Sequence, residues 1–99
     1  MEIAATSTEY VHVNVQAAIG GTAITLAAPP KLAILPIGST ANPAAEDWIT
    51  GEWSESWARI LVGPNGGAVT LSPGRYTVWV SFAAGTESPV YRAGKITVY

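Results

Sequence analysis

Short runs in which apolar and polar residues alternate dominate this chain of 99 residues. In residues 10–16, valines at positions 11, 13 and 15 alternate with polar side chains, which is the period of a strand with one buried face. Residues 31–37 are almost continuously apolar, as is typical of a strand in the centre of a sheet. Apolar residues nowhere recur at helical spacing over ten or more positions. The pattern therefore predicts an all-β fold, with one short helical turn at residues 43–47.

Turn residues divide the rest of the chain into further short strands. Gly20-Gly21 predicts a hairpin-like turn, residues 63–67 a second turn, residues 51–54 a third, and Ala93-Gly94 a bulge. The other predicted strands span residues 22–27, 47–52, 55–62, 68–71, 75–83 and 89–99, of which 75–83 is expected to be the longest regular one. Seven or eight short strands with frequent turns predict a single antiparallel β-sandwich over residues 9–99.

Residues 1–8 differ because they are mostly small or polar and show no hydrophobic pattern. We expect them to form an N-terminal arm that orders only against a neighbouring subunit. The sandwich is expected to have one core, built from the inward side of each strand. Its predicted members are Val11, Val13, Val15, Ile24, Leu26, Ile34, Ile60, Val62, Tyr76, Val78, Val80 and Val98.

Residues 71–80 carry the most specific structural signal. Pro73 and Gly74 turn the backbone, since Pro fixes φ and Gly accepts a positive φ. A strand then begins, with Tyr76 on one face and Trp79 on the other, polar face. The pattern resembles the corner of immunoglobulin-like sandwiches, in which a Tyr near the start of a strand hydrogen-bonds back across the preceding connection. The resemblance predicts a bond from the Tyr76 hydroxyl to the backbone near residues 71–72.

Charge and cysteine usage narrow the possible partners. Only 12% of the residues are charged, the net charge is −2, and the five Lys and Arg residues are scattered along the sequence, which argues against a nucleic-acid partner. There is no Cys, so disulfides and thiolate metal sites cannot form. No secretory signal and no apolar run of membrane-spanning length are visible. We therefore expect a chain that is made in the cytoplasm and does not interact with a membrane.

Candidate chemistry is sparse. His12 is the only histidine, so we interpret it as a surface or interface residue without a chemical role. Four of the seven carboxylates lie within ten positions, but they lack the ligand spacing of a calcium loop. A solvated acidic patch that orients a basic partner is the favoured interpretation. These residues are Glu46, Asp47, Glu52 and Glu55. We predict no catalytic, metal or cofactor site.

The same segment contains Trp48, Trp53 and Trp57. Their spacing prevents one plain strand from placing all three on one face. We expect Trp57 or Trp48 in the core and at least one of the others exposed at a rim. An exposed Trp beside carboxylates allows two interpretations, a protein contact or a sugar-stacking platform, and the contact is favoured.

The whole chain resembles the small immunoglobulin-like virion proteins of tailed bacteriophages and the N-terminal sandwich domains of their baseplate upper proteins. The resemblance rests on residue types in the opening strand, the strand at 31–37, the Trp-rich segment, the corner and the last strand. The quoted segments are Tyr10–Val15, Ala33–Pro36, Asp47–Trp53, Ala58–Ile60, Leu71–Tyr76, Pro89–Val90 and Gly94–Val98.

This resemblance implies an immunoglobulin-like or fibronectin III-like sandwich without enzymatic activity. It implies a virion location after assembly in the host cytoplasm, in many copies, most favourably as a capsid decoration or minor capsid protein. The partner would be the major capsid protein or a head–tail or baseplate component. The alternative is a carbohydrate-binding module that uses exposed Trp side chains on a host-surface glycan.

Overall fold

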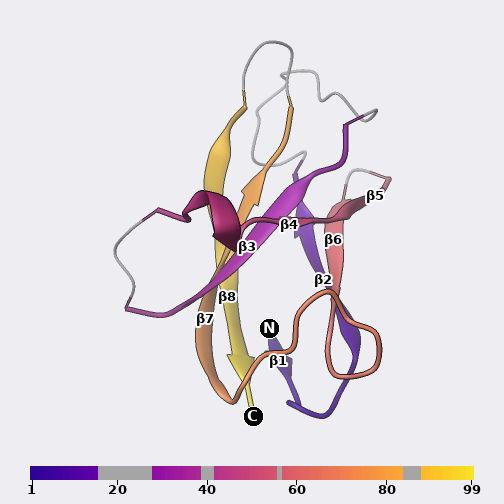
Figure 1. Cartoon of the computed structure of the whole chain (residues 1–99), viewed down its shortest axis with the longest axis vertical. Helices are drawn as coiled ribbons and strands as arrows, with labels where there is room; N and C mark the ends of the chain where they lie inside the picture. The colour runs from indigo at the N-terminus through magenta and orange to yellow at the C-terminus, as the bar shows by residue number, and fades with distance from the viewer. Residues whose placement is uncertain (16–27, 39–41, 56, 84–87) are drawn as a thin grey trace.

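The computed structural model describes residues 1–15, 28–38, 42–55, 57–83 and 88–99. Within these residues the chain is all-β, with strands in two sheets and one 3-10 turn, η1 (Ala45–Asp47), where the sequence predicts a helical turn (Figure 1). The strands are β1 (Glu2–Ile3), β2 (Glu9–Asn14), β3 (Lys31–Pro36), β4 (Ile49–Thr50), β5 (Glu52–Ser54), β6 (Trp57–Val62), β7 (Gly74–Ser81) and β8 (Val90–Val98). None of the helical turns in these ranges is long and apolar enough to cross a membrane.

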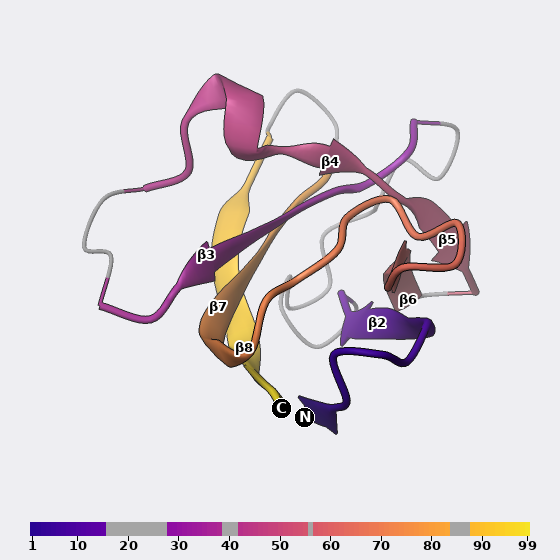
Figure 2. The same cartoon turned by 60° about the horizontal axis from the view of Figure 1, so that its bottom comes forward.

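One sheet has five strands in the order β1-β8-β7-β3-β4, and the other has three in the order β2-β6-β5. As predicted, the apolar β3 is an interior strand, between β7 and β4. The prediction of a purely antiparallel fold is wrong at one pairing, because β1 runs parallel to β8. The two chain ends therefore lie side by side (Figure 2).

The N-terminal residues belong to the fold. Ile3 pairs with Val98, belongs to the core and is only 3% exposed. The backbone N–H of Tyr99 donates to the Ile3 carbonyl at 3.0 Å. The expectation that residues 1–8 order only against a neighbouring subunit is therefore wrong. The two-residue strand β1 is too short to show alternation, so the sequence pattern does not predict it.

The core lies between the two sheets and contains most of the predicted residues. Val11, Val13, Val15, Ile60, Val62, Val78, Val80 and Val98 are buried, as predicted. Ile34 and Tyr76 are partly buried and pack against this core. Ile24 and Leu26, with the predicted strand 22–27 and the turn at Gly20-Gly21, lie outside the described residues. Core residues that the prediction omitted include Ile3, Leu32, Ala58, Phe82 and Ile96.

The chain passes from one sheet to the other at Gly51, between β4 and β5. A Cβ atom at Gly51 would lie 2.7 Å from the Arg59 carbonyl oxygen and 2.8 Å from Leu32 Cδ1, so glycine allows this close crossing. The predicted turn at residues 51–54 is wrong, because these residues include β5. The reversal comes later, at Glu55, whose φ is 56°.

Three smaller expectations have different outcomes. The bulge is confirmed, because Val78 pairs with Gly94 and Trp79 with Arg92, which leaves Ala93 unpaired. The predicted strand at residues 68–71 is reduced to an isolated bridge that involves Val69. The longest strand is β8, with nine residues, and not β7, with eight.

The predicted corner bond is present. The Tyr76 hydroxyl donates to the Ser72 carbonyl oxygen at 2.6 Å, while the ring is half-buried against the core. Gly74 has a φ of 154°, a conformation that L side chains rarely adopt. The turn at Pro73 and Gly74 therefore leads directly into β7, which pairs with β8 from Gly74 onward.

Candidate functional site

The outward side of the five-stranded sheet, the five-strand face, has Trp79 at its centre. Val78 and Val80 point into the core, so Thr77 and Trp79 point outward. Trp79 pairs with Arg92 on β8 and with Ala33 on β3. Directly opposed residues of antiparallel strands share one face, so these three side chains form one row across the sheet.

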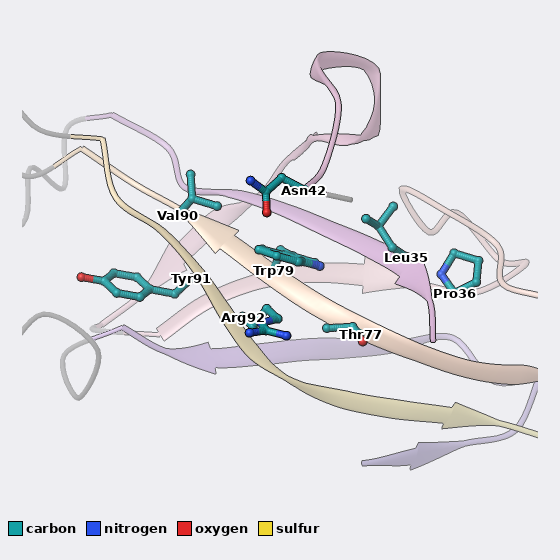
Figure 3. A pocket seen from close by; sticks show the side chains of 8 residues that line it. All are labelled: Leu35, Pro36, Asn42, Thr77, Trp79, Val90, Tyr91 and Arg92. Carbon is teal, nitrogen blue, oxygen red and sulfur yellow. The ribbon is translucent and has the colours of Figure 1, made fainter. Parts of the chain in front are cut away.

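This face is hollowed around Trp79. An open cavity of about 490 Å³ is lined by Leu35, Asn42, Thr77, Trp79 and Arg92, among others (Figure 3). The guanidinium carbon of Arg92 lies 5.8 Å from the Trp79 ring centroid, which is within cation–π range. Asn42 comes from the segment before η1 and lies across the cavity from Arg92 (Figure 3).

Four of the five Lys and Arg residues lie on this same face. Strand alternation and the pairing registers place Arg75 opposite Thr97, Lys95 opposite Thr77, and Lys31 opposite Ser81, in addition to Arg92. Successive rows are two residues apart, or about 6.7 Å along a strand. None of the four forms an ion pair with a described residue. The fold therefore brings four cations that are scattered in the sequence to one face, where Glu2 of β1 opposes Thr97.

The outward side of the three-stranded sheet, the three-strand face, has a different composition. Tyr10, His12 and Trp57 form an aromatic row, with ring centroids 5.9 Å and 6.2 Å apart. The Arg59 guanidinium carbon lies 4.1 Å from the Tyr10 ring centroid, and its Nε donates to Glu52 Oε1 at 2.9 Å. Trp57 is 41% exposed. Here the cation is paired and the aromatic surface faces outward.

The three predicted tryptophans do not share a surface. Trp53 faces inward, donates from Nε1 to the Ala28 carbonyl oxygen at 2.9 Å, and packs edge-on against Phe82. Trp48 is half-buried and lines another hollow together with Lys31. The expectation that Trp57 or Trp48 fills the core is wrong, because Trp57 precedes the buried Ala58 on β6 and therefore points outward, while Trp53 opposes Ala58 and takes the inward position. The expected exposed Trp is confirmed at Trp57.

The predicted acidic residues are also divided between two places. Glu46 and Asp47 belong to η1, where Asp47 Oδ2 accepts the Ala44 N–H at 2.8 Å. Glu52 and Glu55 belong to β5 and its turn on the other sheet. The prediction of one continuous acidic patch is therefore wrong. Among the described residues, no group of three or more His, Asp or Glu side chains is arranged to hold a metal ion.

The hollow around Trp79 was not predicted from the sequence, although one signal for it was present. Trp79 lies on the polar side of a strictly alternating strand, where a large aromatic side chain is unusual unless it contacts something. Its neighbours Arg92 and Asn42 could not be found in this way, because only the pairing registers and the chain before η1 bring them to it.

Comparison with known proteins finds no matching family model, no similar curated protein and no similar solved structure.

Proposed function

We propose that this chain is a non-enzymatic immunoglobulin-like sandwich that serves as a structural protein of a tailed-phage virion. The most favoured role is a capsid decoration or minor capsid protein that binds the major capsid protein. A head–tail or baseplate component is the other partner that the sequence resemblance supports. The proposal needs a fold of this class and a surface suited to a protein partner.

The strand order supports the immunoglobulin-like assignment. In that fold, strands C, F and G form one sheet, to which variable-type domains add C′, while B, E and D lie in the other. In chain order, β3, β4, β7 and β8 take the places of C, C′, F and G, and β2, β5 and β6 those of B, D and E. The bond from Tyr76 to Ser72 at the start of β7 supports the same assignment.

The exposed Trp57 is the observation that carries the partner-binding part of the proposal. Trp, Tyr and Arg are the residue types that most often dominate binding energy at protein interfaces. Trp57, Tyr10 and Arg59 lie on one face, and the pairing with Glu52 holds Arg59 in place before a partner arrives. Such a prearranged surface loses less side-chain freedom on binding.

The alternative of a carbohydrate-binding module keeps only Trp57 of its three Trp residues as an exposed ring of the three-stranded sheet. Trp53 and Trp57 lie on opposite sides of the three-stranded sheet, because Trp53 pairs with the buried Ala58 and Trp57 with Ser54. A sugar ring on Trp57 could not reach Trp53.

Mass spectrometry of purified virions tests the proposal. The chain should be present in many copies, and Trp57→Ala should lower its copy number about tenfold, as expected for the loss of a central aromatic contact. Tyr99→Ala is the matched control, because Tyr99 is 68% exposed and lies outside the three-strand face. Absence of the chain from mature virions would reject the proposal, and equal effects of the two variants would reject Trp57 as the contact.

A further inference from the structure

We propose that the hollow around Trp79 binds a carboxylated sugar residue of an acidic polysaccharide. This site differs from the proposed protein contact in its aromatic ring, Trp79, which lies on the five-strand face. The two proposals can therefore be tested independently of each other. Arg92 also lines a second hollow together with His12 and Trp57.

The floor of the hollow suits the apolar side of a sugar ring. Trp79 points outward from an interior strand and is half-buried, so its position is fixed by the strands on both sides. Its ring carries a negative face, against which the slightly positive C–H bonds of a pyranose pack. Ala33, the partner of Trp79 on β3, is fully buried and adds no polar group beside the ring.

The positive charge beside Trp79 favours an anionic ligand. Arg92 lies in the same row as Trp79, and its guanidinium carbon is 5.8 Å from the ring centroid. A guanidinium presents paired N–H groups that match the two oxygens of a carboxylate. No carboxylate among the described residues pairs with Arg92. Lys95, one row away, adds to the positive potential.

The remaining lining groups are neutral and can both donate and accept hydrogen bonds. Asn42 offers a carboxamide and Thr77 a hydroxyl, which are suited to the hydroxyl groups of a sugar. The cavity volume of about 490 Å³ lies within the usual range for small-molecule sites. An aromatic floor, a cation and neutral hydrogen-bonding groups together match an acidic sugar better than a neutral one.

A single-stranded nucleic acid is less well matched. Proteins that bind such strands stack successive bases on several aromatic rings. The hollow offers the Trp79 ring, while the neighbouring Tyr91 ring is stacked on the core residue Phe82, with centroids 6.2 Å apart. The single Trp79 ring beside the Arg92 guanidinium therefore suits a sugar ring that carries a carboxylate better than a strand of stacked bases.

Isothermal titration calorimetry of the intact chain tests this site. The probes are a β-1,4-linked tetramer of glucuronic acid and the matched neutral tetramer of glucose. We expect the acidic tetramer to bind at least about tenfold more tightly, because only it engages Arg92. Arg92→Gln should remove this difference, and Arg59→Gln on the other face should leave it unchanged.

A second pair of variants separates binding from folding. Trp79→Ala should abolish binding of the acidic tetramer, with the melting temperature recorded beside it. Asn42→Ala changes an exposed side chain and should weaken binding severalfold in a chain that melts like the original. Equal affinity for the two tetramers, no binding of either, or a preference for the acidic tetramer that survives Arg92→Gln would overturn the proposal. Binding of a single-stranded oligonucleotide without binding of the acidic tetramer would overturn it as well.

Discussion

The two outward faces of this domain differ in how their cations are partnered. On the three-strand face, Arg59 pairs with Glu52 and lies over the ring of Tyr10. On the five-strand face, Arg75, Arg92, Lys95 and Lys31 share one surface and have no ion pair among the described residues. One face has its charge already satisfied within the chain, and the other presents charge to the outside.

This difference separates two kinds of binding surface. An internal pair neutralises the local charge and leaves the aromatic rings as the main contact, which suits a protein interface. Unpaired surface cations contribute little to the stability of the fold, but they raise the local concentration of anions. The comparison therefore favours a protein partner on the first face and an anionic ligand on the second.

The largest expected effect comes from the core that both faces share. Leu32 is fully buried between the sheets and pairs with Val80. Leu32→Ala should lower the free energy of unfolding by about 3–5 kcal/mol, through lost burial and the cavity that remains. Urea denaturation measures this loss. A change below about 1 kcal/mol would mean that the two sheets do not close over Leu32 as described.

A smaller loss of stability, confined to the five-stranded sheet, is expected from a change in the N-terminal strand β1. Ile3→Ala should cost about 2–4 kcal/mol, because Ile3 is 3% exposed and belongs to the core. Since β1 pairs only with β8, amide exchange should accelerate first in β8 and not in β2 or β6. Uniform acceleration in both sheets would show that β1 supports the whole fold and not the five-strand face alone.

The sequence predicts the interior of this fold better than its surfaces. Strict alternation located Val11, Val13, Val78 and Val80 correctly, because burial of one strand face is a local property of the sequence. The expectation that Trp57 or Trp48 fills the core failed, because the sequence pattern predicts a turn at residues 51–54 and not a strand in which Trp53 opposes the buried Ala58.

The cationic surface was not predictable for a further reason. Arg75 and Lys95 are twenty positions apart, and only the antiparallel pairing of β7 with β8 brings them to one face. The bulge at Ala93 also decides that Arg92 opposes Trp79. Pairing registers between distant strands are tertiary information, which single-strand patterns do not contain.

The corner at Tyr76 should contribute less to the free energy of unfolding than the core residues do. Tyr76→Phe should lower the free energy of unfolding by about 1–1.5 kcal/mol, because it removes the hydrogen bond to the Ser72 carbonyl oxygen. The five-strand face lies on the opposite side of β7, so affinity for the glucuronic acid tetramer should not change. Loss of that affinity at unchanged stability would show that the corner, and not Arg92, governs the hollow.

The smallest effects compare the two kinds of cation directly. Arg59→Gln should cost about 0.5–1 kcal/mol, since it removes a partly exposed ion pair and a cation–π contact. Lys95→Gln should stay within about 0.5 kcal/mol of the original chain, because Lys95 is exposed and forms no ion pair with a described residue. A double-mutant cycle between Arg59 and Glu52 isolates their coupling, which should shrink at high salt. If Lys95→Gln destabilised the chain as much as Arg59→Gln, the cations of the five-strand face would be structural, and the contrast between the two faces would not hold.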